Sequence, residues 1–138
     1  MQVQPYLHFA GRCEEALTFY RQTLGAKIEL LMRYEDSPEP PPPGIVLPGM
    51  ESKVMHANFR IGDSTLMASD DCTQTAVSHQ GFQLSLTVAD EAEAERCFAA
   101  LADGGQIRMP LAKTFFAPSF GMLTDRFGVS WMVIVAPQ

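Results

Sequence analysis

The segment PYLHFAGRCEEALTFYRQTLGAKIEL, residues 5–30, changes its hydrophobic period twice. Residues 3–10 have the character of a strand, which Gly11 ends. Over residues 12–24 the apolar side chains recur at helical spacing and form one stripe, made of Ala16, Leu17, Phe19, Tyr20 and Leu24. Residues 26–34 then return to a strand. The segment therefore predicts a strand, a helix and a second strand in succession.

Two further strands are expected in this part of the chain. Residues 53–61 alternate apolar and polar side chains, as a half-buried strand does. His56, Asn58 and Arg60 share the polar face of this strand. Residues 64–69 follow a tight turn and complete a hairpin.

The segment that precedes the hairpin, residues 36–50, is rich in proline. Six prolines lie between Pro38 and Pro48. Proline has a fixed φ and no N–H to donate, so this segment is neither a helix nor a central strand. An exposed surface loop is the plainer interpretation, and a lid over a pocket is the alternative.

The same order of elements returns 79 residues later. At this offset Leu7 falls on Leu86, and Gly25–Ile28 falls on Gly104–Ile107. The expected elements of the second copy are strands at 82–89, 106–109, 120–125 and 129–136, and a helix with Asp90 as its N-cap that ends near Ala102. Pro110 ends the second of these strands or places it at a sheet edge. Self-similarity at one offset indicates an internal duplication.

These patterns predict an α+β fold in one domain of 138 residues. The domain consists of two tandem βαβββ units, at roughly residues 1–70 and 80–138. Amphipathic strands with one helix per unit favour a curved, partly open, barrel-like sheet with the helices outside. Sheets of this kind can enclose a cavity for a small molecule.

The composition narrows the possible partners. The formal net charge is −6, and an acidic surface repels phosphate backbones, so nucleic acid is not an expected partner. No apolar run approaches the length needed to cross a membrane. The first five residues have neither the basic nor the apolar region of a signal peptide, so none is expected. The three cysteines, Cys13, Cys72 and Cys97, lack metal spacing and suit a reducing cytoplasm. No cofactor motif is recognisable, so no cofactor is expected.

Short motifs spread over residues 5–135 give the chain a family resemblance. They are Pro5-Tyr6-Leu7, Phe9-Ala10-Gly11, Phe19-Tyr20, Leu24-Gly25, His56-Ala57-Asn58, Arg60-Ile61, Ser69-Asp70, Gly81-Phe82, Thr114-Phe115, Phe120-Gly121 and the segment 124–131. In this order they resemble the vicinal oxygen chelate superfamily, which includes glyoxalase I, extradiol dioxygenases and bleomycin-resistance proteins. The closer similarity is to its PhnB-like branch. The resemblance implies a glyoxalase-like fold and a homodimer.

Members of this branch often carry the label of a demethylubiquinone methyltransferase. The sequence gives that label no support. It contains no strand followed by a glycine-rich turn and helix that could hold an adenosyl cofactor.

The resemblance also implies where a metal ion would bind. Metal-dependent members of the superfamily hold a divalent ion with four side chains, commonly two His and two Glu. In this chain the corresponding positions are Pro5 (or Gln4), Met67, Gln83 and Met132. Proline offers no side-chain donor atom, and a thioether is a poor ligand for hard divalent ions. The sequence therefore predicts that the usual metal site is lost.

Several side chains are candidates for a functional site. His56 is the candidate general acid or base, with Asp70 or Arg60 orienting it. A turn or cap role is the alternative for Asp70, and His8 and His79 are read as structural or surface residues. The candidate ligand-binding residues are Met67, Gln83, Met132, Phe115, Phe116 and Arg60. For the two adjacent phenylalanines, core packing is the alternative.

Four functions follow from these observations. The first is a metal-free protein that binds a small organic molecule in an apolar cavity. The second is an enzyme that uses His56 in acid–base chemistry. The third is a metal-dependent lyase or dioxygenase, which the missing carboxylates disfavour. The fourth is a structural or interaction domain. The sequence alone does not choose between binder and enzyme.

Overall fold

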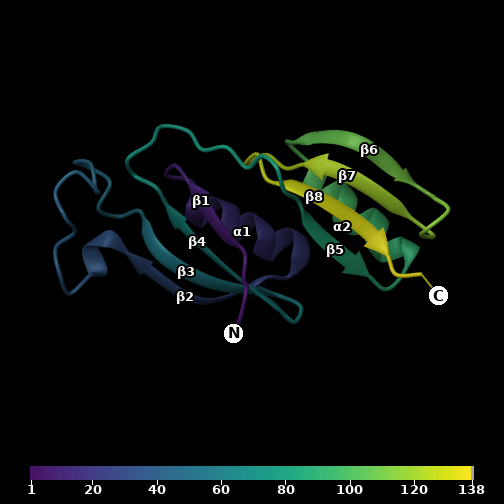
Figure 1. Cartoon of the computed structure of the whole chain (residues 1–138), viewed down its shortest axis with the longest axis horizontal. Coiled ribbons are helices and arrows are strands. Elements are labelled where there is room, and N and C mark those ends of the chain that lie inside the picture. Colours follow the sequence, from purple (N-terminus) through teal and green to yellow (C-terminus); the bar gives the residue numbers. More distant parts are fainter. Residues whose placement is uncertain (138) are drawn as a thin grey trace. The chain divides into compact units, whose positions relative to one another are not determined.

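A computed structural model describes residues 1–137 of the chain (Figure 1). The chain divides into two compact units, Met1–Val77 and Ser78–Gln138. Each unit contains one strand, one α-helix and three further strands in that order, which confirms the predicted duplication of a βαβββ unit. No α-helix within residues 1–137 is both long and apolar enough to cross a membrane.

The first unit is a four-stranded mixed sheet with one helix. Its elements are β1 (Tyr6–Phe9), α1 (Cys13–Leu24), β2 (Lys27–Arg33), the short 3₁₀ helix η1 (Tyr34–Asp36), β3 (Val54–Ile61) and β4 (Ser64–Asp70). The strand order is β1-β4-β3-β2, in which β1 runs parallel to β4 and the other neighbours are antiparallel. The proline-rich segment lies between η1 and β3, and most of its side chains are exposed.

Helix α1 covers one face of this sheet. Its buried residues are Cys13, Ala16, Leu17, Phe19 and Tyr20, which confirms most of the predicted stripe. The Tyr20 ring stacks on Phe59 of β3, with the ring centroids 6.3 Å apart. The helix ends at Gly25, whose φ of 69° is a left-handed conformation that glycine adopts without a steric penalty. Alternate strand residues such as Leu7 and Ala57 are buried on this same face.

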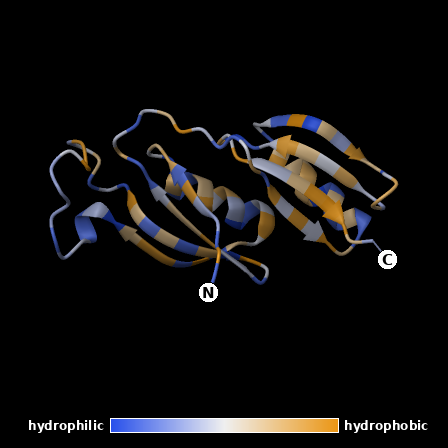
Figure 2. Cartoon of the chain, in the orientation of Figure 1, coloured by the Kyte–Doolittle hydropathy of each residue, from blue (hydrophilic) through white to orange (hydrophobic). Residues whose placement is uncertain are grey.

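The second unit repeats the topology. Its elements are β5 (Leu84–Val88), α2 (Glu91–Ala102), β6 (Gln106–Ala112), β7 (Phe120–Thr124) and β8 (Ser130–Val135). The strand order is β5-β8-β7-β6, with β5 parallel to β8. Figure 2 shows polar and apolar residues mixed along the strands of both units, as expected for sheets whose two faces differ.

The structure decides between the two alternatives for Pro110. The residue lies within β6, which is longer than expected, and β6 sits at the sheet edge, so the edge position is confirmed and the strand end is not. An edge strand tolerates proline because one side of its backbone has no partner. Asp90 caps α2 as predicted, since its Oδ1 accepts a hydrogen bond from the Glu93 N–H at 2.8 Å. Glu93 in turn accepts from Ala89, at 3.3 Å, instead of from the cap residue.

The turn before β8 is built on a buried carboxylate. Asp125 is 3% exposed and accepts hydrogen bonds from the backbone N–H groups of Phe127 and Val129. Its other oxygen accepts from the indole Nε1–H of Trp131 at 2.9 Å. Asp125 therefore holds the turn in place and also anchors it to the buried Trp131.

Candidate functional site

The face of the first sheet that points away from α1 carries most of its polar side chains. Residues paired between strands share a face, and side chains alternate between faces along each strand. Asn58 pairs with Met67, which pairs with Tyr6. Arg60 of β3 pairs with Lys27 of β2. We call this surface the His56 face; it comprises Tyr6, His8, Lys27, Leu30, Met32, His56, Asn58, Arg60, Thr65, Met67 and Ser69.

A short hydrogen-bonded chain crosses the His56 face. The Tyr6 hydroxyl lies 3.1 Å from His56 Nδ1, and His56 Nε2 lies 2.8 Å from Asn58 Oδ1. The Tyr6 and His56 rings are 5.6 Å apart at their centroids, and the ring of His8 lies 4.9 Å from that of Tyr6. His56 is half-buried, so these partners hold its ring in one orientation.

This chain accommodates both charge states of the imidazole. In the neutral ring, Nε2–H donates to Asn58 and Nδ1 accepts the Tyr6 hydroxyl hydrogen. In the charged ring both nitrogens donate, and the Tyr6 hydroxyl hydrogen is released to another acceptor. The arrangement can therefore bind a polar group and can also move a proton between His56 and a molecule that contacts Tyr6.

Asp70 does not lie on the His56 face, where it was expected to orient His56. This residue is 1% exposed, and its carboxylate lies on the α1 side of the sheet. One oxygen accepts from the backbone N–H groups of Gly11 and Cys13, at 2.8 and 2.9 Å, and the other accepts from Val54 N–H at 3.0 Å. The side chains that orient His56 are therefore Tyr6 and Asn58, in place of Asp70 or Arg60 as expected from the sequence.

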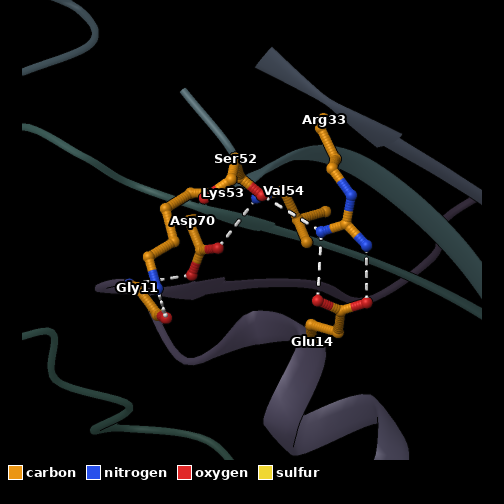
Figure 3. Close-up of a pocket in the computed structure, with 7 residues that line it drawn as sticks. All are labelled: Gly11, Glu14, Arg33, Ser52, Lys53, Val54 and Asp70. Carbon is orange, nitrogen blue, oxygen red and sulfur yellow. Dashed lines mark hydrogen bonds and ion pairs between the residues drawn. The ribbon is translucent and has the colours of Figure 1, made fainter. Parts of the chain in front are cut away.

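A small cavity of about 160 Å³ lies beside Asp70 (Figure 3). It is lined by Gly11, Glu14, Arg33, Ser52, Lys53, Val54 and Asp70. Arg33 donates two hydrogen bonds to the Glu14 carboxylate, at 3.0 and 2.7 Å, and a third to the carbonyl oxygen of Ser52. Lys53 Nζ donates to the Gly11 carbonyl oxygen at 3.0 Å. The hydrogen bond from Arg33 holds the pKa of Glu14 below its ordinary value.

The groups around this cavity mainly join segments of the chain. Arg33 connects the end of β2 to the first turn of α1, and Asp70 connects the end of β4 to the starts of α1 and β3. Sequence reasoning missed this cluster because Arg33 lies 19 residues from both Glu14 and Ser52. No local spacing marks such a contact.

The remaining candidates lie in the second unit. Gln83 Nε2 is 3.6 Å from the Met122 sulfur, and Met122 pairs with Met132 across the sheet. Phe116 packs edge-on against Phe120 with ring centroids 5.1 Å apart, whereas Phe115 is fully exposed. Met67 and Arg60, by contrast, belong to the first unit.

The residues at the superfamily's metal positions do not fit a metal ion. Met67 and Met132 offer thioethers, and Gln83 offers one neutral oxygen. Among residues 1–137, no three His, Cys, Asp or Glu side chains gather closely enough to hold an ion.

The three cysteines are free thiols in the interior. Cys13, Cys72 and Cys97 are at most 3% exposed. Burial raises the pKa of each thiol above its ordinary value, and the Asp70 carboxylate adds to this effect for Cys13 and Cys72. A thiolate is the reactive form, so these positions favour inert packing over nucleophilic chemistry.

Comparison with known proteins now identifies the family. The model of a family described as 3-demethylubiquinone-9 3-methyltransferase matches residues 1–134. The chain belongs to this PhnB-like family. The turn between β1 and α1 contains a single glycine, Gly11, and lacks the Gly-x-Gly-x-x-Gly pattern of a dinucleotide site.

Its relatives agree on family and fold. The chain is 39% identical to Protein YjdN of Escherichia coli (strain K12) over 145 residues, covering 100% of this chain and 97% of YjdN. The crystal structure of PA1353 from Pseudomonas aeruginosa has 45% identity and a TM-score of 0.86, and 100% and 99% of the two chains are covered. A putative 3-demethylubiquinone-9 3-methyltransferase, PhnB protein, from Bacillus cereus has 31% identity and a TM-score of 0.78, with 99% and 100% covered.

A more distant structure shows the superfamily fold. The glyoxylase/bleomycin resistance protein/dioxygenase domain from Frankia sp. EAN1pec has a TM-score of 0.70 at 11% identity, and 100% and 93% of the two chains are covered. The PhnB-like chain therefore has the glyoxalase fold, as the sequence motifs implied.

Proposed function

We propose that this PhnB-like protein binds a small organic molecule on the His56 face, without a metal ion. The observation that carries the proposal is the Tyr6–His56–Asn58 chain, which leaves a half-buried imidazole fixed on a sheet face that α1 does not cover. A hydrogen-bonding group held in a fixed orientation among apolar side chains is typical of ligand sites.

The apolar part of the face supports the same proposal. Met67 lies between Asn58 and Tyr6 in the sheet register, and Met32 pairs with His56. Leu30 pairs with Asn58 and is 43% exposed. Methionine adapts its shape to a bound surface, and the Tyr6 ring offers a flat contact. The molecule we propose therefore has an apolar or aromatic body and at least one polar group.

A thermal-shift screen of small organic molecules tests the proposal. A ligand that binds the native state raises Tm by an amount that grows with ln(1 + [L]/Kd). We expect compounds that stabilise the wild-type protein and lose affinity when Met67→Asp places a charge on the face. Phe115→Asp is the matched control, because Phe115 is exposed in the other unit. A screen whose hits respond equally to both substitutions would contradict the proposal.

Acid–base catalysis is the second candidate, and the Tyr6–His56 hydrogen bond is the observation that favours it. An enzyme of this kind loses its turnover in His56→Ala while a binding protein keeps most of its affinity. Turnover of a screened ligand, followed by NMR as a function of pH, separates the two functions. Proton transfer by His56 predicts a rate that depends on pH in the wild type and is absent in the variant.

We also propose that the protein is a homodimer, as its family resemblance implied. Exposed apolar side chains, among them Phe82, Ile107 and Phe115 in the second unit, support a protein–protein contact. Sedimentation at micromolar concentration tests this, and a monomer there would contradict it.

A further inference from the structure

The charges on the His56 face indicate which class of molecule it binds. Arg60 is half-buried on this face, and its neighbour across the sheet is Lys27, a second cation. Strands β1 and β3 contain no acidic residue, and the one in β4, Asp70, turns its carboxylate toward the start of α1. The one in β2, Glu29, is exposed and pairs with neither Arg60 nor Lys27. A positive region therefore lies on a chain whose formal net charge is −6.

Arg60 is the half-buried member of the arginines without an ion pair. Within residues 1–137, Arg12, Arg33 and Arg126 each pair with a carboxylate, and the other unpaired arginines, Arg21, Arg96 and Arg108, are exposed. Within residues 1–137, the guanidinium of Arg60 has no carboxylate within ion-pair distance, and neither Glu29 of β2 nor Asp63 of the adjoining turn pairs with it. A half-buried guanidinium keeps five N–H donors in a planar fork that matches an oxyanion.

We infer that the ligand of the His56 face is a small organic oxyanion, a carboxylate or a phosphate ester, whose charged group contacts Arg60 and Lys27. This inference rests on the proposed function. It adds the charge of the ligand and the orientation in which the ligand lies along β3. The anionic group lies at the Arg60 end of β3, the apolar body crosses Met67, and a polar group reaches Tyr6 and His56. Residues 56 and 60 lie roughly 13 Å apart along a strand, so a molecule the size of two fused rings with a short substituent fits this span.

Three probes that share one ring system test the charge requirement. They are 2-naphthoate, 2-naphthyl phosphate and the neutral 2-naphthamide, each titrated into ¹⁵N-labelled full-length protein. Chemical-shift changes locate the binding site, and their concentration dependence gives Kd. We expect at least one anion to bind about tenfold more tightly than the amide, the effect of one net charge-assisted hydrogen bond. If 2-naphthyl phosphate has the lower Kd, the natural ligand is a phosphate ester. If 2-naphthoate binds as tightly or more tightly, the natural ligand is a carboxylic acid.

Two matched variants assign the effect to Arg60. Arg60→Gln is expected to remove the preference for the anion, whereas Arg96→Gln makes the same charge change at an exposed position of α2 and is expected to keep it. Arg60→Lys retains the charge without the planar fork and is expected to retain part of the preference, which also controls for folding. Circular dichroism confirms that each variant is folded.

Three results overturn the inference. The first is equal affinity for naphthoate, naphthyl phosphate and naphthamide with shifts on β3 and β4, which leaves the proposed binding site intact but removes its charge selectivity. The second is an anion preference that survives Arg60→Gln. The third is chemical-shift changes that fall outside the His56 face with all three probes. In that case the Met67→Asp comparison in the thermal-shift screen tests separately whether the face binds a ligand at all.

Discussion

Replacing Asp70 tests the structural role that the hydrogen bonds give to this residue. Its buried carboxylate accepts three backbone N–H groups, from Gly11, Cys13 and Val54. A hydrogen bond to a charged group contributes about 1.5–3 kcal/mol, and the contributions of neighbours are not additive. Asp70→Ala removes both acceptor oxygens, and with them all three hydrogen bonds, from a site that is 1% exposed, so we expect a loss in the free energy of unfolding of at least about 3 kcal/mol.

Asp70→Asn separates the effect of the negative charge on stability from the effect of the side chain's shape. The amide oxygen still accepts two N–H groups, but the NH₂ group then faces the Val54 N–H, donor against donor. We expect a loss of about 2 kcal/mol, smaller than for alanine. Because a domain is stable by only about 5–15 kcal/mol, both losses are large enough to measure.

Urea unfolding followed by circular dichroism measures these losses. With an m-value of roughly 2 kcal/mol per molar urea, the alanine variant unfolds about 1.5 M earlier than the wild type. Asp63→Asn in the exposed β3–β4 turn is the matched control and is expected to change stability by less than about 0.5 kcal/mol. If Asp70→Ala unfolds at the same urea concentration as the control, the structural assignment of Asp70 is wrong.

Three further predictions concern other parts of the chain. Gly105→Ala places a Cβ against the Thr124 carbonyl oxygen and the Asp125 backbone, so it should destabilise the protein more than Gly49→Ala. The Cβ at Gly49 meets open space, and its cost is limited to the strain of a left-handed φ of 88°; equal unfolding midpoints would contradict this. The buried thiols, with their raised pKa values, should react with a thiol reagent only after unfolding, and rapid labelling of the native protein at pH 8 would refute it. The pKa of Glu14 is lowered by its hydrogen bond with Arg33, so this pair stabilises the folded protein fully above pH 4.5, the ordinary pKa of the carboxyl group. The contribution is lost as the pH falls through the lowered pKa. Glu14→Gln should therefore differ from the wild type in urea midpoint at pH 7 and converge with it in acid.

The order of elements was predictable because each helix and strand has its own hydrophobic period. The stripe on α1 and the alternation along β3 fix which side chains are buried, so the polar face with His56, Asn58 and Arg60 followed from the sequence. Pro110 was ambiguous because proline either ends a strand or sits at an edge, and only the sheet order shows which applies.

The partners of individual side chains were not predictable from the sequence. Tyr6 reaches His56 from 50 residues away, through the parallel pairing of β1 with β4. Asp70 resembles a strand-end turn residue in the sequence, and its burial depends on backbone groups at Gly11 and Val54 that only the folded unit brings together. Contacts between residues this far apart in the sequence depend on strand register, which local sequence patterns do not specify.

The most direct test of the account is a ¹H–¹⁵N chemical-shift map with the tightest ligand from the thermal-shift screen. We expect the largest chemical-shift changes on residues 56–60 of β3 and 65–69 of β4, with the Tyr6 amide among them, and we expect these changes to vanish in Met67→Asp. Shifts confined to the Asp70 cavity or to the second unit would contradict it.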